Sequence, residues 1–286
     1  MRSDKGRGMK TIWTAVMVVI IGLAACMVNV EPEPVQRYPL APRNTWTYQR
    51  TLSTLNFRPM GGASMNDTTV HAVEMVKIIG QEALPGIGNS WKFLATDDDG
   101  NGVLTSYIFY QEAGDSLQYR AYTNGSVFSP RQKQLLRYAY GGTVSNSLIE
   151  LADGIEQTGH PTRGMLRDSL TIEPAPVTTY LFPLTEGREW IYRTIPFVIT
   201  KKVTGTTTIS THAGRFATTR IHWFWDRDAD GFVDTTIDGY DYVGQKGLIK
   251  RSFFLKDLVA YGPNSPTPIG YFDLSDDFDL TSMDVQ

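Results

Sequence analysis

The sequence predicts a mostly β fold made of two tandem antiparallel β-meander modules, each a curved sheet or half-barrel, with few helices. Three observations support this prediction: alternating apolar and polar residues, turn residues at hairpin spacing, and an aromatic motif that occurs twice. The composition, 41% hydrophobic and 12% aromatic over 286 residues, is sufficient for a packed core and too apolar for a disordered chain.

The clearest alternation lies between residues 217 and 225. Successive side chains of a strand point to opposite faces, so residues at period two share one face: Ala217, Thr219, Ile221, Trp223 and Trp225. Shorter runs at 103–109 and 117–121 have the same period. Turn residues separate such runs, for example Ala113-Gly114-Asp115 and Gly244-Gln245-Lys246-Gly247, which favours antiparallel hairpins.

The repeated motif divides the chain. Tyr38-Pro39-Leu40 followed by Trp46 and Tyr48 recurs 144 residues later (182 − 38) as Phe182-Pro183-Leu184 followed by Trp190 and Tyr192. The predicted organisation is therefore a first β module over 38–153, a connection over 154–181 and a second β module over 182–286. No lysine or arginine follows Lys256, so the acidic C-terminal end is interpreted as a solvated, loosely ordered tail.

The N-terminal residues predict export. A basic start leads into an apolar run from Thr11 to Ala25, which is shorter than the roughly 20 residues of a membrane-spanning helix. The run ends in Leu23-Ala24-Ala25-Cys26, which resembles the lipobox of bacterial lipoproteins. The resemblance implies a signal peptide over 1–25, a diacylglycerol and an acyl chain such as palmitate on Cys26, and a tether over 26–37. An uncleaved anchor helix or an ordinary secretory signal is the alternative.

The same resemblance suggests a location. Met27 stands where an aspartate would retain an enterobacterial lipoprotein at the inner membrane, which indicates the outer membrane. Together with the two aromatic motifs, the signal resembles that of uncharacterised bacterial envelope lipoproteins, a group that brings no known activity. Cys26 is the only cysteine, so the exported chain is predicted to fold without disulfides.

Two Asp-rich segments predict calcium sites. The pattern D-x-[DN]-x-[DN]-G places oxygen ligands at alternate positions of a tight turn, as in the first half of an EF-hand loop. The candidate ligands are Asp97, Asp99 and Asn101 in the first segment and Asp226, Asp228, Asp230 and Asp234 in the second. Ile108 and Ile237 occupy the twelfth position, where a bidentate glutamate belongs, so any affinity would be weak, about 10⁻⁴–10⁻³ M. The alternative is a metal-free hairpin turn.

The remaining features favour a protein without catalytic activity. A net charge of −3 argues against nucleic acid as a partner. The four histidines lack metal-ligand spacing, and no nucleophile elbow occurs. The first hypothesis is a lipid-anchored envelope protein that binds or supports an envelope protein or glycan. The second is a carrier of lipid or another apolar ligand, and an envelope hydrolase ranks below both. A carrier cavity would be lined by aromatic residues that could equally be ordinary core: Trp91, Phe93, Tyr107, Phe109, Trp223 and Trp225.

Overall fold

The computed structural model describes residues 33–62, 64–100, 102–123, 126–127, 137–140, 143–145, 151–152, 170–195, 197–262 and 266–286. The chain divides into two compact units, Met1–Glu33 and Pro34–Gln286. The fold described below is that of the second unit. The predicted signal peptide, Cys26 and most of the predicted tether lie outside the described residues.

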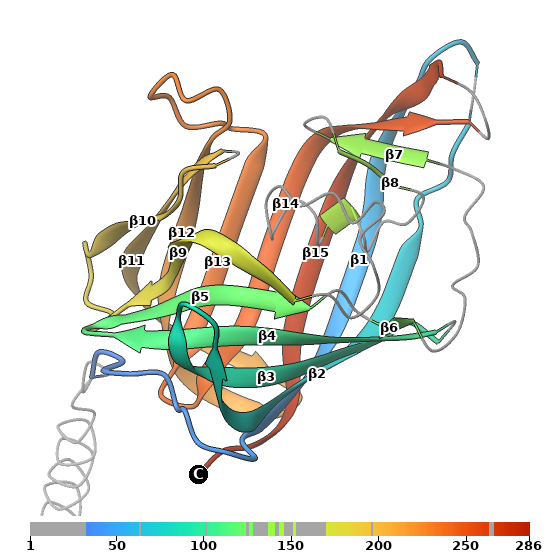
Figure 1. Ribbon diagram of the computed structural model, residues 1–286. Helices are drawn as coiled ribbons and strands as arrows, with labels where there is room; N and C mark the ends of the chain where they lie inside the picture. The colour runs from blue at the N-terminus through green and yellow to red at the C-terminus, as the bar shows by residue number, and fades with distance from the viewer. Residues whose placement is uncertain are drawn as a thin grey trace, which may run out of the picture. The chain divides into compact units, whose positions relative to one another are not determined.

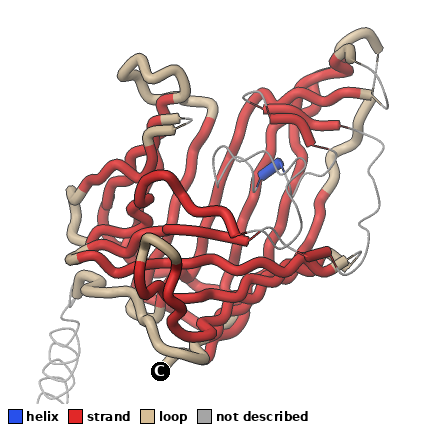
Figure 2. The backbone as a smooth tube through the Cα atoms, in the orientation of Figure 1, coloured by secondary structure: helices blue, strands red, loops and turns tan. Residues whose placement is uncertain are grey.

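The second unit is one antiparallel sheet composed of two meanders (Figures 1 and 2). The first meander contains β1 (Thr45–Pro59), β2 (Thr69–Leu84), β3 (Gly88–Asp98), β4 (Val103–Ala113), β5 (Ser116–Thr123) and β9 (Leu170–Leu181). The second contains β10 (Glu189–Arg193), β11 (Val198–Thr211), β12 (Gly214–Asp226), β13 (Ile237–Gly244), β14 (Gly247–Tyr261) and β15 (Pro268–Asp284). Three short strands lie off this path: β6 (Ser126–Val127), β7 (Arg137–Tyr140) and β8 (Thr143–Ser145). The predicted fold class, a mostly β chain of antiparallel meanders in a curved sheet, is confirmed.

The first and last strands of the unit join the two meanders. β1 pairs with β15 from Thr45↔Asp284 to Pro59↔Gly270, so the strand order runs β10 to β15 and then β1 to β5 and β9. The interpretation of the acidic end as a loosely ordered tail is therefore wrong, because β15 is a central strand. Its carboxylates face basic side chains of the two neighbouring strands, for example Asp276 with Arg50 and Asp279 with Lys250.

The sheet curls until its two edge strands, β9 and β10, come close to each other (Figure 1). Side chains join these edges. The Trp190 Nε1 donates to the Thr178 carbonyl at 3.0 Å, and Arg193 forms an ion pair with Glu173 at 3.2 Å. A nearly closed curved sheet results, in which one seam is held by side chains.

The turns that follow the two aromatic Tyr/Phe-Pro-Leu segments share a positive φ and one type of backbone hydrogen bond. Arg43 and Gly187, 144 residues apart (187 − 43), have φ angles of 75° and 82°. The Arg43 amide donates to the Ile78 carbonyl at 2.8 Å, and the Gly187 amide donates to the Val203 carbonyl at 2.9 Å. In both places a positive φ turns the chain into the first strand of a meander.

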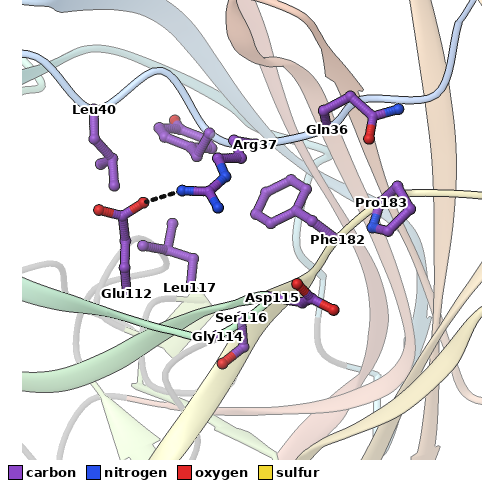
Figure 3. Close-up of a pocket in the computed structure, with 11 residues that line it drawn as sticks. Gln36, Arg37, Leu40, Glu112, Gly114, Asp115, Ser116, Leu117, Phe182 and Pro183 are labelled. Carbon is purple, nitrogen blue, oxygen red and sulfur yellow. Dashed lines mark ion pairs between the residues drawn. The ribbon is translucent and has the colours of Figure 1, made fainter.

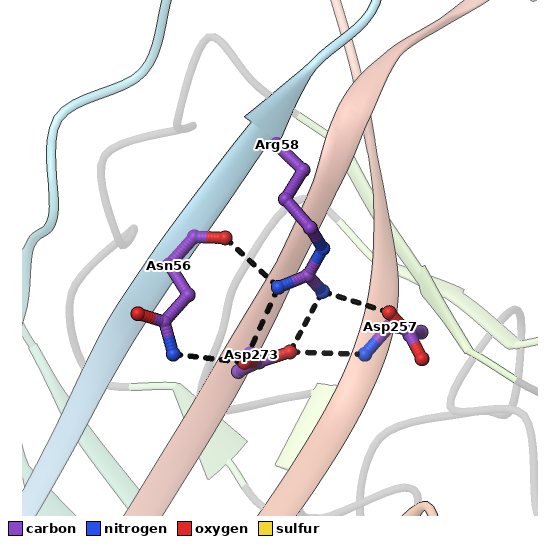
Figure 4. A network of polar contacts seen from close by, with 4 residues as sticks. All are labelled: Asn56, Arg58, Asp257 and Asp273. Carbon is purple, nitrogen blue, oxygen red and sulfur yellow. Dashed lines mark hydrogen bonds and ion pairs between the residues drawn. The ribbon is translucent and has the colours of Figure 1, made fainter.

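β-Bulges bend the long strands where β1, β15 and β14 lie side by side (Figure 4). Asn56 and Asp257, at the bulges of β1 and β14, have positive φ angles of 54° and 59°. Asp273 on β15, between them, accepts hydrogen bonds from the Asn56 side chain at 3.0 Å and from the Asp257 amide at 3.2 Å. It also pairs with Arg58 at 2.8 Å. One carboxylate thus holds both bulges.

Candidate functional site

Charged side chains are buried on the inner face of the curled sheet. Lys201 on β11 and Asp241 on β13 are both 0% exposed, and their Nζ and Oδ2 atoms lie 3.2 Å apart. The Arg251 Nε on β14 donates to the other carboxylate oxygen at 2.7 Å. Burial raises the pKa of Asp241, but attraction from Arg251 and Lys201 outweighs that effect and lowers the pKa below its ordinary value. Asp241 is therefore ionised and shared between two cations.

Aromatic rings surround the Lys201 ammonium. Its Nζ lies 3.6 Å from the ring centroid of Trp223, 4.5 Å from that of Tyr192 and 5.2 Å from that of Tyr180. The ring faces carry negative charge density, so they attract a desolvated cation. Lys201 also donates to the Thr179 carbonyl at 3.3 Å. The ammonium is thus held by a carboxylate, a carbonyl and π faces together.

Two further ion pairs are buried. The Arg50 Nη2 and Nε lie 2.6 and 3.0 Å from the two carboxylate oxygens of Asp276, in a bidentate arrangement. Arg193 and Glu173 form the second pair across the seam. The name inner ion-pair network is used below for these seven residues: Arg50, Glu173, Arg193, Lys201, Asp241, Arg251 and Asp276.

Sequence reasoning missed the inner ion-pair network, although a signal was present. Lys201 lies at period two between the buried residues Ile199 and Val203, and Arg50 lies between Tyr48 and Leu52 in the same way. A charged residue at an apolar position of an alternating strand points to the inner face of the sheet. That signal identifies the buried charges but not their partners, which come from other strands.

A pocket of about 210 Å³ is lined by the segment that precedes β1, the β4–β5 turn and the residues after β9 (Figure 3). The segment that precedes β1 lines one side of it with Arg37 and Leu40. Glu112 at the end of β4 and Asp115 in the β4–β5 turn line another side, and Phe182 after β9 completes the wall. Arg37 and Glu112 form an ion pair at 3.9 Å (Figure 3). The pocket lining combines apolar side chains, among them Leu117 and Phe182, with charged ones.

The second Asp-rich segment is a hairpin loop between β12 and β13. Its carboxylates accept hydrogen bonds from the loop itself: Asp226 from the amides of Asp230 and Gly231, and Asp230 from the Phe232 amide. Asp234 forms an ion pair with Arg227 and accepts a hydrogen bond from the Thr236 hydroxyl. Burial raises the pKa of Asp234, but these hydrogen bonds and Arg227 lower it below its ordinary value.

In the first Asp-rich segment, between β3 and β4, Asp97 belongs to β3 and Asp99 accepts a hydrogen bond from the Gly102 amide. Asn101 lies outside the described residues. Across the part of the chain that the structure describes, no group of three or more His, Cys, Asp or Glu side chains could hold a metal ion. Calcium binding by either loop stays a prediction.

The six aromatic residues predicted as a cavity lining lie in three separate clusters. Trp223 and Trp225 pack with Phe253 and Leu151. Phe93 packs with Trp46, with Trp91 against the same cluster. Phe109 and Tyr107 belong to a third cluster. The structure does not bring the six together around one space.

Within the described residues, no helix is both long and apolar enough to cross a bilayer. Cys26 and the signal peptide precede the first described residue, so lipidation stays a prediction from the sequence.

No protein-family model and no curated protein match this chain. Two solved structures are similar to it. One is a provisionally assigned exported protein with a YmcC-like fold from Bacteroides fragilis, with 12% identity, 87% of this chain and 99% of that chain covered, and a TM-score of 0.30. The other is a provisionally assigned lipoprotein from Parabacteroides distasonis, with 12% identity, 88% and 100% covered, and a TM-score of 0.32. Neither similarity supplies a site or an activity for this chain.

Proposed function

We propose that this chain is a lipid-anchored cell-envelope protein, at the outer membrane, that binds or supports an envelope protein or glycan without catalysing a reaction. The anchor is supported by the lipobox-like Leu23-Ala24-Ala25-Cys26 and by Met27 after it. Two or more acyl chains on one residue hold a protein on a membrane stably, whereas a single chain binds marginally.

The observation that carries the non-catalytic part of this proposal is the state of the buried acids. General acid–base catalysis needs a carboxyl group whose pKa lies near the working pH and which reaches the substrate. Asp241 has the opposite properties, because it is fully buried and held ionised by Lys201 and Arg251. Asp276 is likewise fully buried against Arg50. These ion pairs support a structural role for the charges.

Membrane fractionation of the expressed chain tests the anchor. The unmodified chain is expected in the detergent-extracted membrane fraction, with palmitate incorporated at Cys26. Cys26→Ser should abolish the incorporation of palmitate. The variant should then either leave the membrane fraction or stay in it only as the unprocessed precursor. Extraction and labelling that do not change with Cys26→Ser would contradict the proposal.

A second candidate, the carrier of an apolar ligand, is favoured by one observation. The Nε1 atoms of Trp223 and Trp225 are buried, and neither has a hydrogen-bond acceptor among the described residues. The two rings are stacked 6.3 Å apart. Each unsatisfied donor costs about 1–3 kcal/mol, which an oxygen atom of a bound ligand would recover.

Native mass spectrometry of residues 27–286 distinguishes the two candidates. A carrier should copurify with a lipid-sized adduct, and Trp225→Phe, which keeps a ring but removes the N–H group, should reduce its occupancy. Trp190→Phe is the matched control, because its Nε1 already donates to Thr178. A chain free of adducts favours the first candidate.

A further inference from the structure

The pocket of Figure 3 is built by the segment that leads from the predicted anchor into the sheet. Residues 34–40 are called the strap here. The strap is packed against the body: Val35 is buried and its carbonyl accepts the Leu184 amide at 2.9 Å, and Tyr38 stacks on Tyr180 at 5.8 Å. The pocket wall formed by the strap is therefore held in place rather than free.

The charges around the pocket are unequal. Two carboxylates, Glu112 and Asp115, stand against one guanidinium, that of Arg37. Asp115 forms an ion pair with Arg188 at 3.9 Å, but Arg188 does not line the pocket. A cationic ligand would therefore meet two acids, whereas an anionic ligand would meet one arginine and two repelling charges.

Arg37 is the weakly held member of this set. Its side chain is 77% exposed and lies 3.9 Å from Glu112, and such surface pairs contribute only about 0–1 kcal/mol. Glu112 is better fixed, because the Trp91 Nε1 donates to its carboxylate at 3.3 Å. A ligand cation can thus replace Arg37 beside Glu112 at little cost, and the guanidinium can move into solvent.

The pocket interior limits the ligand. Leu40, Leu117 and Phe182 give it apolar walls. Its volume of about 210 Å³ is smaller than the roughly 300–1,000 Å³ of pockets that take drug-sized molecules. It therefore fits a short apolar group or a headgroup.

We propose that this pocket binds a small amphipathic ligand with an ammonium group, which takes the place of the Arg37 guanidinium beside Glu112 while the apolar part lies against Leu117 and Phe182. The inference extends the proposed binding role. A free amine and the ethanolamine headgroup of a phospholipid share this chemistry. The headgroup source rests on the proposed anchor: Cys26 and Gln36 are ten positions apart in the sequence, so a fully extended chain between them spans at most about 35 Å.

Three isosteric probes test the ligand class on the full chain: 2-phenylethylamine, neutral 2-phenylethanol and anionic phenylacetate, each titrated by saturation-transfer NMR. The amine is expected to bind most tightly and phenylacetate least. Glu112→Gln should weaken amine binding by about tenfold or more, because a hydrogen bond to a charged group is lost. Arg37→Gln should strengthen it by about two- to fivefold, because a competing cation is removed.

Glu189→Gln is the matched control, since Glu189 is an exposed carboxylate on β10 that pairs with Lys202 at 3.2 Å. It should leave amine binding unchanged. Equal binding of the three probes, or the same effect from Glu112→Gln and Glu189→Gln, would overturn the proposal. A melting curve of each variant confirms that it is folded.

Vesicles distinguish the two sources. Phosphatidylethanolamine vesicles that displace 2-phenylethylamine, where phosphatidylglycerol vesicles do not, assign the site to the headgroup. Displacement by both in equal measure would overturn the headgroup source, and the free amine then stands. The Cys26→Ser chain separates this inference from the anchor: it should bind 2-phenylethylamine normally, so a failed anchor and a failed pocket give different results.

Discussion

Asp241 offers the sharpest test of how the interior is held together. The change Asp241→Asn keeps the side-chain volume and removes the charge that both Lys201 and Arg251 approach, at 3.2 and 2.7 Å. Lys201 is fully buried and Arg251 is only 21% exposed, so water compensates little for the lost carboxylate. Breaking a buried ion pair by removing one partner costs about 3–5 kcal/mol. The free energy of unfolding should fall by about that amount.

Lys201→Met is the matched control, because it removes the cation and keeps most of the aliphatic stem. Asp241 then retains Arg251. The variant loses the attraction between the ammonium and the Trp223 ring, which contributes about 2 kcal/mol for a desolvated cation. It also avoids the desolvation of an ammonium on folding, which costs several kcal/mol and offsets this loss. The expected loss of stability is below about 2 kcal/mol.

Guanidinium unfolding followed by tryptophan fluorescence at pH 7 compares the two variants, with equal m-values required for the comparison. The reasoning is refuted if Lys201→Met costs as much as Asp241→Asn, or if Asp241→Asn costs less than about 1 kcal/mol. The pH dependence supplies a second check. The folded-state pKa of Asp241 is lowered, so its stabilisation is present above the unfolded value near 4 and is lost as the pH falls below it. Asp241→Asn should therefore flatten the acid limb of the stability curve.

Four further predictions rest on other parts of the fold. Burial raises the pKa of Tyr38 to about 12 and those of Tyr48 and Tyr180 well above 10. The stability that these tyrosines contribute should therefore be constant below pH 10 and should fall as the pH rises toward 12, which near-ultraviolet circular dichroism can follow. Asp273→Ala should lower the free energy of unfolding by about 1–3 kcal/mol, since the Asn56 and Asp257 bulges lose their shared acceptor; Asp284→Ala is the exposed control. Asp228→Ala should abolish any calcium-dependent rise in melting temperature, and an unchanged rise would place the ion elsewhere. Residues 34–181 and 182–286, one meander each, should be poorly soluble apart and should form a folded complex when coexpressed, because β1 and β15 otherwise expose long edges.

The sequence alone predicts the strands and hairpin turns of this fold well. Period-two alternation at 217–225 predicts the strand that the structure shows as β12, and turn residues at Gly244–Gly247 predict the β13–β14 hairpin. It does not predict the pairing of β1 with β15. The paired residues are more than 200 positions apart along the chain, and no local pattern specifies their register. The prediction of a loosely ordered acidic tail is wrong for this reason, since its carboxylates have basic partners only in the folded sheet.

The candidate site, too, is predicted in its local parts and not in its long-range contacts. The repeated motif identifies the strap residues Tyr38 and Leu40 in the sequence. The other walls of the pocket come from the β4–β5 turn and Phe182, which lie elsewhere in the chain. The aromatic residues expected to line one cavity lie in three clusters. The pair on β3 and the pair on β4 point to opposite faces and cannot meet, and Trp223 and Trp225 belong to β12. Composition identifies the residue types of a site, whereas topology decides which of them meet.

Two of the buried ion pairs lie at the two places where the meanders meet. Arg50 on β1 pairs with Asp276 on β15 at the paired junction, and Arg193 on β10 pairs with Glu173 on β9 at the seam. In strand order within each meander, β1 corresponds to β10 and β15 to β9, so both junctions carry an arginine from a first strand and an acid from a last strand. Apolar residues of the same volume would stabilise such a junction at least as well, but they would tolerate a shifted register. A shift of two residues keeps every side chain on its own face but separates each arginine from its carboxylate, and this penalty makes each pair a determinant of how the two meanders align.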